Sequence, residues 1–80
     1  MTYTVEMNAA QMKFIKEFFE NYEDDKVKLT LKDASNRVKH IYIAETELDQ
    51  KTLENHLKTE FKNKAPMASA LYYTIHAKQS

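Results

Sequence analysis

The sequence predicts an α+β fold in which strands and helices follow the order βαββαβ. Four short runs alternate apolar and polar residues with a period of two, which is typical of half-buried strands. Two longer stretches repeat apolar residues every three or four positions, which is typical of amphipathic helices. With 80 residues, 42% of them hydrophobic and 30% charged, the chain is expected to form one compact domain over residues 1–80.

The first strand is predicted over residues 2–7. Its residues alternate between apolar side chains, expected to face a core, and polar side chains, expected to face away from it. The apolar set is Tyr3, Val5 and Met7, and the polar set is Thr2, Thr4 and Glu6.

A helix is predicted over about residues 9–23. Asn8 and Gln11 form a variant of the capping box at its start. The apolar residues that follow at helical spacing are Met12, Ile15, Phe18, Phe19 and Tyr22. Carboxylates gather at the other end, where the helix macrodipole disfavours anions by a few tenths of a kcal/mol each, on the order given by peptide studies. Helix propensity does not explain this cluster, so its members are candidate partner-binding residues: Glu20, Glu23, Asp24 and Asp25.

A central hairpin is predicted from two further period-two runs, one starting at Lys26 and one over residues 37–44. If Ile41 and Ile43 share the buried face with Leu29 and Val27, Asp33 lies opposite Arg37 and the loop between the strands has three residues, 34–36. Asn36 then takes the left-handed conformation that such a loop requires. On the outer face this register pairs Lys28 with Tyr42, Thr30 with His40 and Lys32 with Val38.

A second helix and a last strand complete the pattern. Thr46 and Asp49 open the helix, which is predicted to end near Asn63. Its buried row, with a residue every four positions, is Leu53, Leu57 and Phe61. The last strand is predicted over residues 70–78, with Leu71, Tyr73, Ile75 and Ala77 inward and Tyr72, Thr74 and His76 outward.

This order suits two split crossovers that give an antiparallel four-stranded sheet, order 4-1-3-2, with two helices on one face. That is the ferredoxin-like sandwich. In topology it resembles RNA-recognition-motif, acylphosphatase, metallochaperone and ACT-type domains. The motifs of those families are missing: the strands lack glycine-flanked aromatic residues, no arginine follows the first strand, and there is no CxxC sequence.

Composition excludes several classes of function. Glycine, cysteine and tryptophan are absent, so phosphate-cradling glycine loops, disulfides, thiolate nucleophiles and cysteine-ligated metals are excluded. Twelve basic residues balance twelve acidic ones. The apolar stretches are too short to span a membrane and the amino end lacks a basic signal sequence, so a cytoplasmic protein with no membrane partner is expected.

The sheet face opposite the helices is predicted to be basic and aromatic. Its candidate partner-binding residues are Lys28, Lys32, His40, Tyr42, Tyr72 and His76. Lysines and exposed rings of this kind bind single-stranded nucleic acid, with phosphates on the lysines and bases stacked on the rings. The alternative is that the lysines protect an edge strand from pairing with other chains.

Enzymatic and metal sites are not expected. In the predicted register the three histidines, His40, His56 and His76, do not converge, and no serine, histidine and carboxylate group together. No cofactor is expected either. His56 is interpreted as a solvated or edge-packed residue of the second helix.

By elimination, the sequence predicts a small non-enzymatic protein-binding module. It would be an inhibitor, adaptor or regulatory accessory protein, acting through the sheet face, a sheet edge or the acidic end of the first helix. Its composition resembles that of accessory proteins of phages and mobile elements, including nuclease inhibitors. The alternatives are a single-stranded nucleic-acid-binding domain and a homodimer formed through the sheet face.

Overall fold

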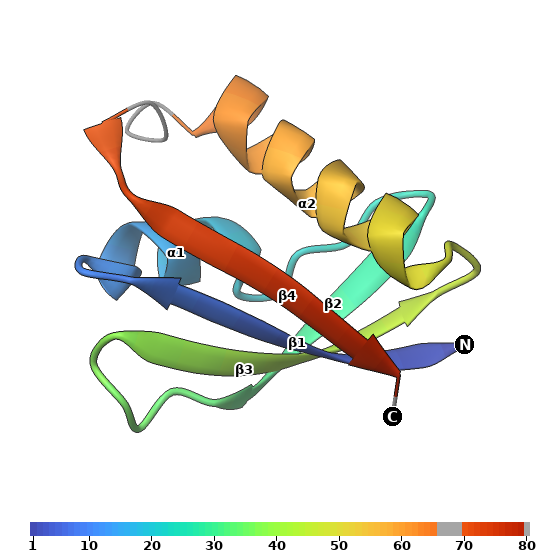
Figure 1. Ribbon diagram of the computed structural model, residues 1–80, viewed down its shortest axis with the longest axis horizontal. Coiled ribbons are helices and arrows are strands. Elements are labelled where there is room, and N and C mark those ends of the chain that lie inside the picture. The colour runs from blue at the N-terminus through green and yellow to red at the C-terminus, as the bar shows by residue number, and fades with distance from the viewer. Residues whose placement is uncertain (66–69, 80) are drawn as a thin grey trace.

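A computed structural model describes residues 1–65 and 70–79, and Figure 1 shows the path of the chain. Strands and helices follow the predicted order. Their bounds are β1 Thr2–Ala9, α1 Met12–Phe19, β2 Val27–Asp33, β3 Lys39–Thr46, α2 Gln50–Lys64 and β4 Tyr73–Gln79. Within these described residues, no helix is long and apolar enough to cross a membrane.

The four strands form one antiparallel sheet in the order β2-β3-β1-β4. Read from its other edge, this is the predicted order 4-1-3-2. Both helices lie on the same side of the sheet and leave the other side uncovered (Figure 1). The predicted ferredoxin-like α+β fold is therefore confirmed.

The core lies between the sheet and the helices. Tyr3, Val5 and Met7 of β1 point into it and are at most 2% exposed. Phe19 of α1 stacks on Phe61 of α2 with ring centroids 5.6 Å apart. The predicted row of α2, Leu53, Leu57 and Phe61, is completely buried. Since a fully buried side chain of this size contributes about 1.5–3 kcal/mol, packing rather than helix propensity holds both helices in place.

Helix α1 is shorter than predicted at both ends. Strand β1 continues through Ala9, so Asn8 pairs with Lys39 in the sheet and forms no capping box. At the other end Asn21 has a φ of 61°, in the left-handed region that terminates a helix. The prediction that the helix runs to residue 23 was therefore wrong, and the acidic residues beyond Glu20 belong to a loop.

The hairpin of β2 and β3 has a different register from the predicted one. Lys28 lies opposite Glu45, not opposite Tyr42, which is a shift of three residues (45 − 42). A bulge between Leu31 and Asp33 interrupts the ladder, and the loop to β3 has five residues, 34–38. The expected left-handed Asn36 was also wrong, because Asn21 is the one non-glycine residue with a positive φ in the described part of the chain.

The shift by an odd number of residues turns β3 over. Side chains alternate along a strand, so every residue of β3 moves to the opposite face. His40, Tyr42 and Ala44 point into the core, and Ile41 and Ile43 point away from the helices. The two isoleucines of β3 therefore lie on the uncovered side of the sheet. The side chains that β3 buries are those of His40, Tyr42 and Ala44.

Helix α2 agrees with prediction, whereas strand β4 begins at Tyr73, three residues later than predicted, and ends at Gln79. The Asp49 side chain caps α2 by accepting a hydrogen bond from the Thr52 amide at 2.8 Å. Ile75 and Ala77 are buried, as expected, and His76 between them is exposed. The amide of Ala77 donates to the Glu54 carboxylate at 2.7 Å, which joins the helix to the strand.

Candidate functional site

The uncovered side of the sheet, the open face, differs from the predicted one because β3 is turned over. Its side chains form four rows across the paired strands: Lys28–Glu45–Thr2, Thr30–Ile43–Thr4–Lys78, Asp33–Ile41–Glu6–His76 and Lys39–Asn8–Thr74. Three lysines and three carboxylates balance in these rows, so the predicted basic character of the face was wrong. Two adjacent isoleucines occupy its centre, and both are partly exposed.

Three predicted members of the open face lie elsewhere. His40 and Tyr42 are 5% and 0% exposed and lie beneath α1, because of the shifted register. Tyr72 precedes β4 and is 87% exposed, beside the sheet rather than on it. Of the remaining candidates, Lys28 and His76 lie on the open face as predicted, and Lys32 is exposed at the bulge. No described strand residue on the open face is a phenylalanine or tyrosine.

His40 and Tyr42 are buried without full hydrogen bonding. Neither Nδ1 of His40 nor the hydroxyl of Tyr42 has a hydrogen-bond partner among the described residues. Burial lowers the pKa of His40, and the nearby Lys16 ammonium lowers it further. Burial, reinforced by the Glu20 carboxylate, raises the pKa of Tyr42 to about 12. Both side chains are therefore neutral at pH 7 and act as parts of the core.

Both edges of the sheet are partly covered. The segment after α1 lies against β2, where the Leu29 amide donates to the Tyr22 carbonyl at 2.8 Å and the Asp24 amide donates to the Val27 carbonyl at 2.9 Å. At the other edge Glu54 accepts from the β4 amide of Ala77. These contacts limit pairing with a strand from another chain.

The predicted acidic cluster separates into two parts. Glu20 lies at the end of α1 and pairs with Lys16 at 3.7 Å. Glu23, Asp24 and Asp25 line an open groove of about 520 Å³. Two further carboxylates line this acidic groove, Glu45 at the end of β3 and Glu47 in the following loop. The groove also includes two lysines, Lys26 and Lys28. Two segments of the chain, residues 23–25 and 45–47, thus bring five carboxylates to one groove.

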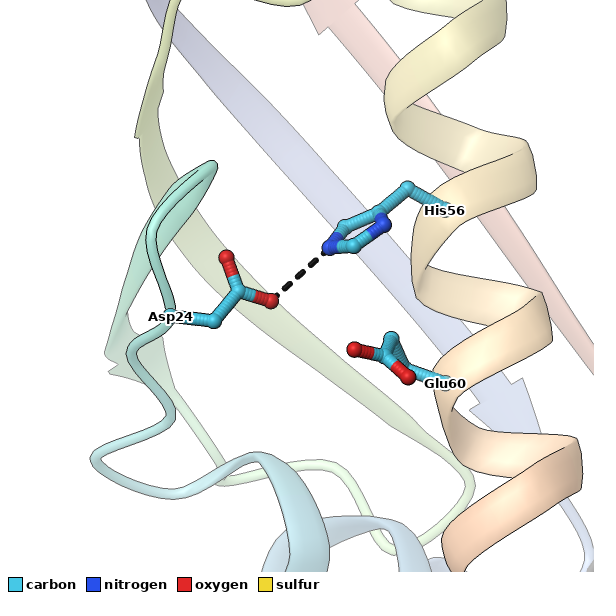
Figure 2. A group of neighbouring side chains, drawn as sticks. All are labelled: Asp24, His56 and Glu60. Carbon is cyan, nitrogen blue, oxygen red and sulfur yellow. Dashed lines mark hydrogen bonds and ion pairs between the residues drawn. The ribbon is translucent and has the colours of Figure 1, made fainter.

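Asp24 has a second role at the back of the groove, where it joins the loop before β2 to helix α2. Its Oδ1 accepts hydrogen bonds from the amides of Lys26, at 2.7 Å, and Val27, at 2.9 Å. Its Oδ2 lies 2.5 Å from the Tyr22 hydroxyl and 2.8 Å from Nε2 of His56. Figure 2 shows His56 and Glu60 projecting from α2 toward Asp24. The residues Tyr22, Asp24, His56 and Glu60 are called the Asp24 cluster below.

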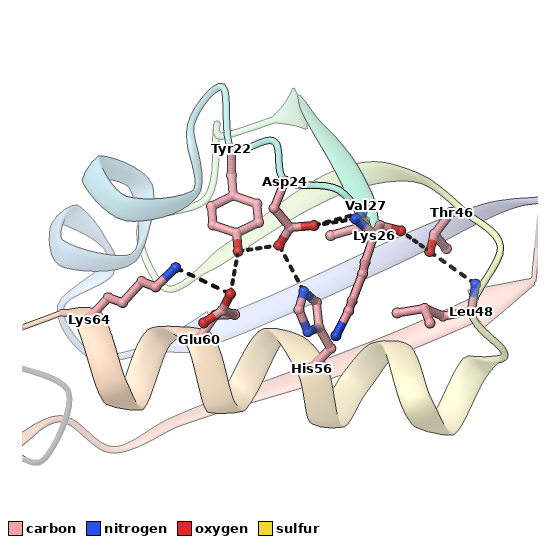
Figure 3. Close-up of polar contacts among 9 residues, drawn as sticks. All are labelled: Tyr22, Asp24, Lys26, Val27, Thr46, Leu48, His56, Glu60 and Lys64. Atoms are coloured by element: carbon pink, nitrogen blue, oxygen red, sulfur yellow. Dashed lines mark hydrogen bonds and ion pairs between the residues drawn. The ribbon is translucent and has the colours of Figure 1, made fainter.

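The contacts of the Asp24 cluster extend in both directions (Figure 3). Glu60 Oε1 lies 3.4 Å from the Tyr22 hydroxyl and 3.3 Å from Nζ of Lys64. On the other side, the Thr46 hydroxyl donates to the Lys26 carbonyl at 2.6 Å. The loop before β2 is therefore held to α2 and to the end of β3 through polar contacts.

The protonation states of the Asp24 cluster follow from these contacts. Partial burial by itself would raise the pKa of Asp24, but hydrogen bonds from Tyr22, His56 and two backbone amides outweigh it and hold that pKa well below its usual range. Asp24 is thus ionised and accepts its bonds, so Nε2 of His56 carries the proton between them. Burial, followed by the carboxylates of Asp24 and Glu60, raises the pKa of Tyr22 well above its ordinary value.

Sequence reasoning missed His56 and Glu60 as members of a site. Only 14% of the His56 side chain is exposed, and it is hydrogen-bonded rather than solvated. The available signal was the spacing of His56 and Glu60, four residues apart on one face of a helix. The partner of this pair, Asp24, could not be identified because its position depends on the path of the loop after α1.

Compared with known protein families, with curated proteins and with solved structures, the chain matches none. Its function is therefore argued from the open face, the acidic groove and the Asp24 cluster.

Proposed function

We propose that the chain is a small non-enzymatic protein-binding module that docks its partner through the open face and the acidic groove together. The observation that carries this proposal is that the two surfaces are continuous. The row Lys28–Glu45–Thr2 belongs to the open face and also lines the groove. Because these three residues belong to both, the open face and the acidic groove form one continuous surface at this end of the sheet.

The centre and the border of this surface have the composition of a protein interface. Ile41 and Ile43 supply adjacent, partly exposed apolar side chains on β3. Charged and hydroxyl-bearing residues surround them: Lys28, Thr30, Glu45, Thr4, Glu6 and Lys78. An apolar centre within a polar rim is typical of surfaces that bind another protein.

The acidic groove favours a basic segment of the partner. Its five carboxylates outnumber its two lysines, and the amino-terminal ammonium donates to the Thr46 carbonyl at 2.9 Å. A lysine or arginine of the partner would be attracted to Glu45 and Glu47 while an apolar side chain covers Ile43. Such charge complementarity increases association rate and specificity more than affinity. Inhibitors, adaptors and regulatory accessory proteins are the classes that this arrangement suits.

The alternative, binding of single-stranded nucleic acid, has less support. Its mechanism requires a basic surface with rings on which bases stack. Tyr42 is buried and Tyr72 lies outside the sheet, while lysines and carboxylates balance on the open face. The two classes of partner are separated by the experiment below.

The proposal is tested by capturing partners from a lysate of the organism that encodes the chain, with and without nuclease treatment and at two salt concentrations. Wild type is compared with Ile43→Glu at the centre of the surface and with the double variant Glu45→Lys/Glu47→Lys at the groove. Glu17→Lys, a matched charge reversal on the exposed side of α1, is the control. Circular dichroism verifies that each variant is folded.

The expected result is a stoichiometric complex that survives nuclease and moderate salt, persists with Glu17→Lys, and is lost with both surface variants. Purified partner should then bind at least about tenfold more weakly to either surface variant. If the captured material disappears on nuclease treatment, the partner is nucleic acid and the proposal is wrong. Equal binding by all four proteins would contradict the proposed surface.

A further inference from the structure

The Asp24 cluster brings three metal-ligating side chains together from two elements. His56 and Glu60 lie one helical turn apart on α2, and Asp24 comes from the loop before β2 (Figure 2). One ligand atom from each of the three lies within 4.8 Å of the other two. Adjacent ligands of a tetrahedral zinc ion are about 3.3 Å apart, given metal–ligand bonds of about 2.0–2.1 Å. The observed separations lie around this value, since Nε2 of His56 and Oδ2 of Asp24 are 2.8 Å apart and no pair of the three ligand atoms is more than 4.8 Å apart.

The ligand types favour a particular class of ion. One imidazole nitrogen and two carboxylate oxygens are donors that zinc and its neighbours in the first transition row accept. Magnesium and calcium prefer oxygen ligands alone, so the imidazole nitrogen of His56 favours zinc over both of them. The chemistry therefore distinguishes a zinc-class ion from a hard cation.

The surroundings of these three ligands have features that metal sites use. Tyr22 donates a hydrogen bond to Asp24 at 2.5 Å, and its hydroxyl lies 3.4 Å from Glu60. A hydrogen-bond donor to a ligating carboxylate helps to orient that carboxylate for a metal. The Asp24 and His56 side chains are 19% and 14% exposed, and Asp24 also lines the acidic groove, which is open to solvent.

From this geometry we propose that Asp24, His56 and Glu60 bind one divalent transition-metal ion of the zinc class. The ion takes the place of the proton that now lies between Nε2 of His56 and Oδ2 of Asp24. The Nε2 proton passes to solvent while Nδ1 takes up a proton from solvent, so the imidazole stays neutral and presents the lone pair of Nε2 to the metal. Water completes the coordination, and Tyr22 keeps its hydroxyl proton as a donor to the carboxylates. Binding ties the loop before β2 to α2 more firmly.

Isothermal titration of the chelator-treated full chain with zinc chloride tests the stoichiometry and the residues. We expect one ion per chain, with an affinity at least about tenfold weaker in His56→Gln and in Glu60→Gln than in wild type. His76→Gln removes an exposed imidazole outside the site and should bind as wild type does. Asp24 is left intact in these variants because its other hydrogen bonds hold the loop.

A second measurement uses the unaltered chain and does not depend on the folding of any variant. In amide ¹H–¹⁵N spectra, zinc should shift signals of residues 22–27 and of the turn of α2 from residue 56 to residue 60. Magnesium chloride at the same concentration should leave them unchanged. The proposal is overturned if zinc gives no saturable binding, if His56→Gln binds as tightly as wild type, or if magnesium binds equally well.

Discussion

Nε2 of His56 lies 2.8 Å from Oδ2 of Asp24 and joins α2 to the loop before β2 across 32 residues of sequence. The same carboxylate accepts hydrogen bonds from two amides of its own loop and from the Tyr22 hydroxyl. One side chain thus fixes the loop conformation and its attachment to the helical layer. Because this loop also forms one wall of the acidic groove, the shape of the proposed partner surface depends on Asp24.

Substitution of Asp24 by alanine is therefore expected to lower the free energy of unfolding by about 2–3 kcal/mol. The variant lacks the ionised carboxylate that accepts hydrogen bonds from the Tyr22 hydroxyl, from His56 and from two backbone amides. Most of these donors are partly buried and lose their acceptor, which lowers stability. Asp25→Ala is the matched control, because its exposed carboxylate makes a change within about 0.5 kcal/mol the expectation. Chemical denaturation of the two variants and wild type measures both values. Equal losses would show that Asp24 does not hold the loop.

The fold could be predicted because each element carries a local signal. The apolar period of β1, the Asp49 cap and the row that includes Leu53 and Leu57 all depend on neighbouring residues, and all agree with the structure. The order of the strands and helices, together with the short connections between them, then leaves few topologies for a chain of this size. Local patterns were therefore sufficient for the architecture.

The face of β3 could not be predicted in the same way. Ile41 and Ile43 alternate with His40 and Tyr42, so hydrophobicity alone favours burying the isoleucines. The structure buries the imidazole and phenol instead, because the larger rings fill the space beneath α1, where Phe19 lies 6.4 Å from Tyr42 between ring centroids. The register between β2 and β3 depends on both strands and on the loop between them. It also depends on the bulge between Leu31 and Asp33, for which the sequence contains no recognisable pattern.

The left-handed conformation of Asn21, just after α1, leads to a prediction about substitutions at this position. Its φ of 61° is readily adopted by glycine and asparagine and costs other residues, most of all β-branched ones. Asn21→Gly is expected to leave thermal stability unchanged or slightly higher, and Asn21→Val to lower the free energy of unfolding by about 1 kcal/mol or more.

Asn36 is the control for Asn21, since its side chain only accepts a hydrogen bond from the Val38 amide in an exposed loop. Glycine and valine at position 36 should differ by less than the same pair at position 21. A larger difference at position 36 would restore the predicted three-residue loop and contradict the observed register.

The buried hydroxyl of Tyr42 predicts that its removal is tolerated. The hydroxyl has no hydrogen-bond partner among the described residues, and an unpaired buried hydroxyl costs stability. Tyr42→Phe keeps the ring and is expected to unfold with a free energy equal to that of wild type or about 1 kcal/mol higher. Tyr22→Phe, which loses a donor to Asp24, should instead lose about 1 kcal/mol. A loss of 1 kcal/mol or more in Tyr42→Phe would show that this hydroxyl is bonded.

The buried imidazole of His40 predicts how stability changes in mild acid. Burial and Lys16 of α1 lower its pKa, and Asp33 of β2 only partly opposes them. An unfolded histidine binds its proton near pH 6.5, so below this pH the unfolded chain binds more protons than the folded chain. Stability therefore falls as the pH decreases from about 6.5 through the lower pKa of the folded state.

Replacing His40 by leucine, which fills the site without a titrating group, should remove this part of the acid sensitivity. The free energy of unfolding, measured by denaturation from pH 7 to pH 5, should fall less steeply in His40→Leu than in wild type. Because the other titratable groups are common to wild type and His40→Leu, equal slopes in these two proteins would mean that His40 is protonated in the folded chain as readily as in the unfolded one.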